Sequence, residues 1–130
     1  MQLPVIQAKN LIEENLPMWI DEIYTTSIPS SVSSNIHTNV ILITETINEP
    51  LSYGNNVFKH WEIGVELQIF YKAHIESDFS MMNAEIELAN LFKKNNWFLE
   101  HSRNHIKDPD TKQLSKVFYF TKKEKLKEDI

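Results

Sequence analysis

A run of alternating side chains from Trp61 to Ala73 (WEIGVELQIFYKA) constrains the fold more than any other feature of this sequence. A period of two places alternate residues on opposite faces of a β-strand. Here the two sets are Ile63, Val65, Leu67, Ile69 and Tyr71, and Glu62, Gly64, Glu66, Gln68 and Phe70. The run therefore predicts a strand of an antiparallel sheet that buries one face and keeps the other mostly polar.

Two further stretches have helical periodicity. The first begins at Pro4, which suits the first position of a helix, and Pro17 stops it after Leu16. The second runs from Phe79 to Lys94, with Ser77 or Asp78 as the candidate N-cap and Asn95–Asn96 as the C-cap. Both helices are amphipathic, so each is expected to lie on the sheet.

The remaining segments complete one mixed α+β domain. Further strands are expected over 39–47, 97–105 and 114–123, with a short strand or turn over 18–24. Ser/Pro-rich residues 27–38 predict a loop, 48–59 a loop or wide hairpin connection, and 106–113 a turn around Asp108–Pro109–Asp110. The prediction is a single antiparallel (mixed) sheet packed by two helices, in the order α-β-β-α-β-β, over 1–123, with a charged tail over 124–130.

Composition excludes several classes of protein. The 130 residues suit one domain, and the absence of Cys excludes disulfides and thiol catalysis. Two glycines, Gly54 and Gly64, cannot form a glycine-rich phosphate loop. No apolar run is long enough to span a membrane, and the N-terminus does not resemble a signal peptide, so a cytoplasmic product without membrane partners is expected. The net charge of −5 argues against a protein that binds duplex DNA.

Large apolar side chains on both faces of the predicted sheet point to a partner. Phe70 points away from Ile69 and Tyr71, and Phe118 and Phe120 point away from Val117 and Tyr119, yet two helices cover only one face. Either other molecules cover the second face, or the loops 27–38 and 48–60 fold back over it. On the first interpretation, the candidate subunit contacts are Phe58, Trp61, Phe70, Phe118 and Phe120.

Catalytic chemistry has weak support. His101, His105 and Asp108 suggest a metal-dependent hydrolase, but residues four apart on a strand are about 13 Å from each other, too far for one ion. Asp-Pro-Asp-Thr is also ordinary turn chemistry. Lysines around the aromatic residues of 116–122 suit single-strand binding, although a core strand with a charged edge explains them better. We expect a non-enzymatic protein that needs no cofactor or metal.

The order of motifs resembles a family of small tail proteins of long-tailed phages that infect Gram-positive hosts. The resemblance covers about residues 3–123. It rests on Ile69-Phe70-Tyr71-Lys72, on the following helix that starts near an Asp, and on Asp108-Pro109-Asp110-Thr111-Lys112-Gln113-Leu114 leading into Phe118-Tyr119-Phe120. This family, long described only as a domain of unknown function, is similar in size and element order to tail terminator (tail-completion) proteins.

The resemblance implies a structural role in the virion. Such proteins form a hexameric ring at the head-proximal end of the tail, where they cap the tube of major tail protein and meet the head–tail connector. DNA passing through the ring should not stick, so acidic side chains are expected at the lumen, either Glu62 and Glu66 or the acidic first helix. The alternatives are a monomeric protein-binding module and, with less support, the small metal-dependent hydrolase.

Overall fold

A mixed β-sheet organises the chain, whose computed structural model describes residues 1–15, 17, 19–33 and 36–127. In this described part the sheet has six strands and is accompanied by three helices. The elements are α1 (Pro4–Asn15), β1 (Glu22–Thr25), α2 (Ser30–Ser33), β2 (Val40–Gly54), β3 (Val57–Phe70), α3 (Met81–Lys94), β4 (Phe98–Ser102), β5 (Ile106–Lys107) and β6 (Leu114–Lys125).

The strands lie in the order β1-β2-β3-β6-β4, and β5 also pairs with β6. β1 runs parallel to β2, while the other pairs are antiparallel. The predicted α+β class with one mixed sheet is therefore confirmed. The short helix α2 was not predicted; it lies within the segment expected to be a loop.

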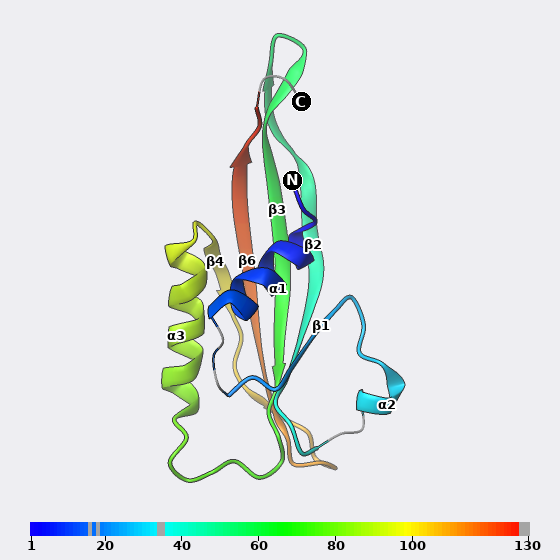
Figure 1. Ribbon diagram of the computed structural model, residues 1–130, viewed down its shortest axis with the longest axis vertical. Coiled ribbons are helices and arrows are strands. Elements are labelled where there is room, and N and C mark those ends of the chain that lie inside the picture. Colours follow the sequence, from blue (N-terminus) through cyan, green and yellow to red (C-terminus); the bar gives the residue numbers. More distant parts are fainter. Residues whose placement is uncertain (16, 18, 34–35, 128–130) are drawn as a thin grey trace.

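Of the two alternatives predicted for 48–59, the structure has the hairpin, but with a tight turn rather than a wide connection. β2 and β3 continue through this segment and meet at a two-residue turn, Asn55–Asn56, whose φ angles are 51° and 64°. Left-handed angles at both positions belong to the hairpin turn that matches strand twist, and Asn tolerates them. Pro50 suggested a loop, but proline is accepted in an edge strand. The hairpin projects beyond the helices at the top of Figure 1, so it does not fold back over the sheet.

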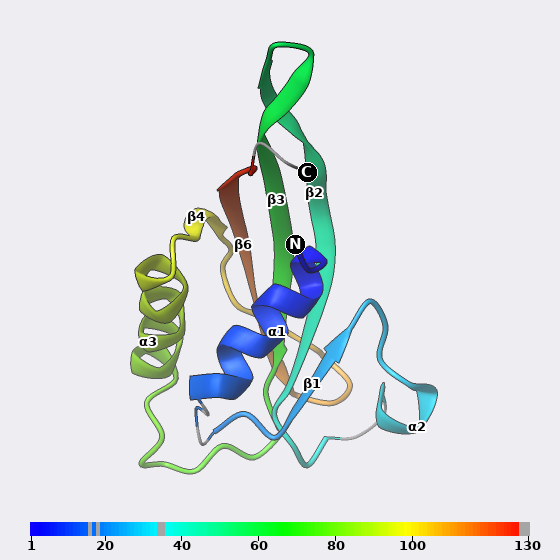
Figure 2. The ribbon, with the colours of Figure 1, turned by 45° about the horizontal axis from the view of Figure 1, so that its top comes forward.

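Helices α1 and α3 pack on the same face of the sheet, the one that carries Ile63, Val65, Leu67 and Ile69 (Figure 2). α1 contributes Val5, Ala8 and Ile12, as its periodicity predicts; Leu16 lies outside the described residues. The opposite face, here called the open face, is covered by neither helix. Among the helices that the structure describes, none is long and apolar enough to cross a membrane.

Helix α3 starts two residues later than predicted, with Ser80 rather than Ser77 or Asp78 as its N-cap. The Ser80 side chain accepts a hydrogen bond from the Asn83 amide at 3.3 Å. Phe79 instead closes a turn on Glu76, and its ring packs near Trp19 and Tyr71. The predicted C-cap at Asn95 is confirmed.

The C-terminal strands are divided differently from the prediction. The segment 97–105 forms only the short β4, interrupted by a register shift between Leu99 and His101. β5 follows at Ile106–Lys107, inside the predicted turn, and β6 extends to Lys125. The turn itself is as expected: the Asp108 carboxylate accepts hydrogen bonds from the Asp110 and Thr111 amides at 2.8 and 3.2 Å.

Phe118 and Phe120 lie in the core, so their assignment to a subunit interface was wrong. They are 4% and 1% exposed, and the Phe120 ring stacks on Phe92 of α3 at a centroid distance of 4.3 Å. β6 pairs Phe118 with Leu67 and Phe120 with Val65, which places both under the helices. The alternation had shown correctly that β6 has two apolar faces, but it did not show which face the helices cover.

We expect Phe120→Ala to lower the free energy of unfolding by about 3–5 kcal/mol, because it leaves a cavity under α3. Phe98→Ala is the matched control, since Phe98 lies on neighbouring β4 and is 65% exposed; it should change stability by less than about 0.5 kcal/mol. Urea unfolding followed by tryptophan fluorescence measures both. Equal losses would contradict the placement of Phe120 in the core.

Candidate functional site

The β2–β3 hairpin between Asn48 and Trp61, here called the arm, is the most prominent surface feature of the molecule (Figure 1). β1 ends where Thr25 pairs with Ile43, and β6 ends where Lys125 pairs with His60. Beyond these points, among the described strands, β2 and β3 pair only with each other. A two-stranded ribbon of this kind is only marginally stable by itself in water.

The arm exposes apolar side chains that the body of the same chain does not bury. Leu51, Val57 and Phe58 are 44%, 44% and 51% exposed. The Phe58 ring meets Trp61 edge-on at a centroid distance of 5.7 Å, a favourable arrangement for two aromatic rings. The Trp61 indole donates a hydrogen bond to the Asn48 side-chain oxygen at 2.6 Å, which fixes its orientation.

A hollow of about 340 Å³, here called the arm hollow, lies along the arm, from Asn56 at its turn to Trp61. Its apolar lining consists of Val57, Phe58, Trp61 and Leu126, and Lys59 and Lys127 also line it. The Leu126 amide donates to the Lys59 carbonyl at 2.9 Å, so this hydrogen bond holds the C-terminal segment beside the arm. The structure thus brings together Phe58 and Trp61, two of the candidate contacts.

Phe70 lies apart from this cluster, at the other end of β3. It is partly buried on the open face, paired with Val40 of β2 and Ser115 of β6. The alternation predicted its face correctly. Phe70 and the arm therefore belong to separate surfaces rather than to one contact site.

Glu62 and Glu66 share the open face, on the side of β3 opposite the core residues. Glu62 lies between Glu49 on β2 and Lys123 on β6 in the sheet register. Two carboxylates directly opposite each other repel, so Glu49 and Glu62 form an unfavourable pair that the fold accepts. This acidic pair and Glu66 form a stripe along the open face.

The Glu66 carboxylate is held by its neighbours. Its two oxygens accept hydrogen bonds from Thr44 Oγ1 at 3.1 Å and from the Tyr119 hydroxyl at 2.9 Å. The hydrogen bond to Glu66 raises the pKa of Tyr119, and the nearby Arg103 guanidinium partly offsets this effect. Glu66 is thus a fixed acceptor with a defined geometry, whereas no such contact is described for Glu62.

The residues of the alternative hydrolase site do not come together. His101 lies on the open face near the Tyr119 ring, His105 contacts Glu85 on α3, and Asp108 serves its own turn. Within 1–15, 17, 19–33 and 36–127, no three His, Asp or Glu side chains are grouped closely enough to hold a metal ion. The geometry gives this alternative no support.

A buried polar network centred on Glu85 of α3 was not predicted from the sequence. Glu85 is 5% exposed, and its Oε2 accepts hydrogen bonds from the Tyr71 hydroxyl at 2.6 Å and from His105 Nε2 at 2.7 Å. Its position in the helical repeat, beside Ala84 and three residues before Leu88, is the signal that indicated burial. Because each neighbour donates to one carboxylate, the network serves to anchor α3 to the end of β3.

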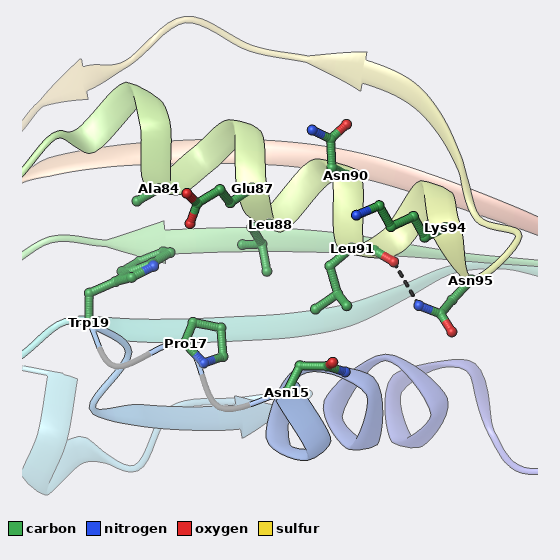
Figure 3. A pocket seen from close by; sticks show the side chains of 10 residues that line it. All are labelled: Asn15, Pro17, Trp19, Ala84, Glu87, Leu88, Asn90, Leu91, Lys94 and Asn95. Atoms are coloured by element: carbon green, nitrogen blue, oxygen red, sulfur yellow. Dashed lines mark hydrogen bonds between the residues drawn. The ribbon is translucent and has the colours of Figure 1, made fainter.

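A second hollow of about 480 Å³ lies between the end of α1 and α3, as Figure 3 shows. Pro17, Trp19, Leu88 and Leu91 give it apolar walls, and Asn95 donates from its side chain to the Leu91 carbonyl at 2.9 Å. Its polar lining consists of Asn15, Glu87, Asn90, Lys94 and Asn95. Amides and one charge of each sign do not assemble a nucleophile with its base.

One family of proteins matches nearly the whole chain. Residues 2–125 match the family described as "Protein of unknown function (DUF806)". No curated protein matches the sequence.

The buried network predicts a specific alkaline weakness. Burial, and then the hydrogen bond to Glu85 and its charge, raise the pKa of Tyr71 far above the usual value of 10.0. The unfolded chain therefore releases this proton first, and stability falls as the pH rises above about 10, by up to about 1.4 kcal/mol per pH unit. We expect Tyr71→Phe to lose this part of the pH dependence in urea unfolding between pH 8 and 11.

Tyr119→Phe is the control for that experiment, because Tyr119 also donates to a carboxylate but lies on the open face. It should keep most of the alkaline loss of stability. If Tyr71→Phe and the unmodified protein lose stability in parallel above pH 10, then burial and Glu85 do not raise the pKa of Tyr71 in the folded protein.

Proposed function

We propose that this chain, which belongs to the family described as a protein of unknown function (DUF806), is a structural protein of a phage tail. In this proposal, copies of the chain form a hexameric tail terminator ring at the head-proximal end of the virion tail. The ring caps the tube of major tail protein and joins it to the head–tail connector, and assembly takes place in the host cytoplasm.

The arm is the observation that carries this proposal. Apolar and aromatic side chains on a projecting two-stranded ribbon cost solvation free energy in a free monomer, and a partner that covers them recovers it. Leu51, Val57 and Phe58 are each more than two-fifths exposed. Such an arm suits a protein whose working state is an assembly, and it has no evident use in a catalytic monomer.

The open face supports the second part of the proposal, which concerns DNA. Glu49 and Glu62 lie opposite each other on β2 and β3, and Glu66 lies four residues along β3 on the same face. These three carboxylates outnumber Lys123 of β6, which lies beside Glu62. A wall with these carboxylates repels the phosphate backbone and does not retain DNA that moves past it. We therefore assign the open face to the lumen of the ring and the arm to contacts between proteins.

The motifs that carry the resemblance to tail proteins agree with this interpretation. Asp108 closes the turn before β6, and Phe118 and Phe120 then enter the core of the monomer. These residues are therefore requirements of the subunit fold, and the assembly contacts lie elsewhere. A monomeric protein-binding module that uses the arm is the competing function, and oligomeric state separates the two.

Light scattering on the purified chain, alone and with tube and connector proteins, tests the ring. We expect a particle of about six times the 15.3 kDa chain mass, and we expect Phe58→Asp to shift it toward the monomer because a charge enters an apolar contact. Phe98→Asp is the matched control, since Phe98 is 65% exposed on β4; it should assemble normally. A particle that stays at 15.3 kDa with every partner would instead support the monomeric module.

The lumen assignment is tested by reversing one charge. We expect rings of Glu62→Lys to retain duplex DNA at low salt, with a slope of log affinity against log salt that steepens by about 0.9 for each phosphate contacted. Glu14→Lys makes the same charge change on an exposed position of α1 and should retain little DNA. Equal retention by the two variants would remove the open face from the lumen.

A further inference from the structure

We propose that the arm hollow holds the outer edge of strand β2 of a neighbouring copy of this chain. The residues of that edge are Glu49 and Leu51, here called the β2 ridge. Leu51 enters the apolar lining of the hollow, and Glu49 meets its lysines. This inference rests on the proposed ring and specifies how its subunits meet.

The arm hollow combines an apolar lining with positive charge. Phe58 and Trp61 meet edge-on in it, and the hydrogen bond from Trp61 to Asn48 holds the indole in place. Lys59 and Lys127 also line the hollow, and the described lining residues include no carboxylate. Charge complementarity therefore selects an occupant that carries an apolar side chain next to a carboxylate.

The β2 ridge has both properties. Leu51 is 44% exposed, and it lies in the register shift between Pro50 and Ser52, where an extra residue bulges out of the ladder. Glu49, two residues earlier, is exposed as well. Neither residue lines the hollow of its own chain, so the ridge is available to a second molecule.

Glu49 forms no ion pair with any residue that the structure describes. Its neighbour on β3 is Glu62, which repels it. β1 pairs with β2 only as far as Ile43, so no described strand lies on the other side of Glu49. A lysine of a neighbouring copy can occupy that side, and Glu62 and Glu66 then remain for the lumen.

The ridge and the hollow lie on opposite sides of the arm at the same level. β2 and β6 flank β3 (Figure 1), and the hollow is on the β6 side, where Leu126 continues that strand. The register pairs Pro50, inside the ridge, with Trp61, which lines the hollow. Subunits that stand side by side with the open face toward a lumen bring these two sides together. A contact between two different surfaces is heterologous and closes into a ring when the rotation closes.

Other exposed apolar side chains do not meet these conditions. Those outside the arm are Met1, Leu3, Met82, Ile86, Phe98, Leu99 and Ile106. They precede α1 or belong to α3, β4 and β5, so subunits that stand side by side do not bring them to the level of the hollow (Figure 1). Val57 and Phe58 line the hollow themselves. Leu51 therefore remains, among the arm side chains that the structure describes.

Chemical cross-linking tests the contact directly, because the chain contains no Cys. Val57→Cys places a thiol in the hollow, and Pro50→Cys places one between the two residues of the β2 ridge. Both variants keep Phe58, Glu49 and Leu51. We expect a short bismaleimide to link the two single variants into dimers when they are co-expressed, since each thiol then lies near one on a different copy.

Ile106→Cys replaces Pro50→Cys in the matched control, because Ile106 is 64% exposed on β5 and lies outside the arm. It should link to Val57→Cys several-fold less. Equal linking, or efficient linking of Val57→Cys to itself, would overturn the pairing. Light scattering separates the two hypotheses: rings without the link between ridge and hollow refute this contact alone, whereas monomers with every partner refute both.

A charge exchange gives a second readout. Glu49→Lys should weaken assembly, because it sets a lysine against Lys59 and Lys127, and Lys59→Glu combined with Lys127→Glu should restore it. Glu14→Lys makes the same charge change on an exposed position of α1 and should leave assembly unchanged. Rings that form normally with Glu49→Lys, or that the exchange does not restore, would contradict the assigned partner.

Urea unfolding shows whether a loss of assembly comes from the contact or from the fold. Glu49→Lys replaces a like-charge pair with Glu62 by an opposite-charge pair, so it should not lower the free energy of unfolding of the monomer. A clear loss of monomer stability in this variant would contradict the repulsion on which the argument for a cationic partner depends.

Discussion

The structure depends on the burial of one face of the long β3–β6 pair under two helices. Val65, Leu67, Phe118 and Phe120 belong to a core that α1 and α3 close from the same side. Two helices of 12 and 14 residues cannot reach the far end of strands of similar residue number, because a strand rises about twice as far per residue. The arm is a consequence of this mismatch in length, and the open face is a consequence of both helices lying on one side of the sheet.

How much of this the sequence predicted depends on the range of the interactions involved. Alternation within 61–73 identified both faces of β3, and the helical periods located α1 and α3, because these patterns are local. Alternation could not show which face of β6 the helices cover, because that depends on the register that sets Phe118 opposite Leu67. The length of the arm was missed for a related reason: Pro50 and Asn55–Asn56 favour a loop or a wide connection locally, and only the pairing of two strands shows that both continue to a tight turn.

The candidate site was predictable to a similar extent. Glu62 and Glu66 were placed on the correct face because period two requires it, and Phe58 and Trp61 do lie together. Phe118 and Phe120 were misassigned by a wrong choice between two faces. Glu85 was missed because a carboxylate is normally exposed unless hydrogen-bond donors accompany it into the core. Its donors, Tyr71 and His105, come from distant segments of the chain.

The arm and the open face have opposite physical requirements, and the fold meets both by pointing Trp61 and Glu62, which are adjacent on β3, to opposite faces of the sheet. A protein–protein contact gains from apolar side chains that lose water, as at Phe58 and Trp61. A surface that lets a polyanion pass must stay hydrated and negative, and apolar rings there would hold bases by stacking. On the open face the acidic stripe lies on the half of β3 toward the arm, whereas Phe70 lies at the opposite end of the strand. If the proposed lumen is correct, its narrowest part should therefore follow the acidic stripe, and Phe70 should lie away from the path of the DNA.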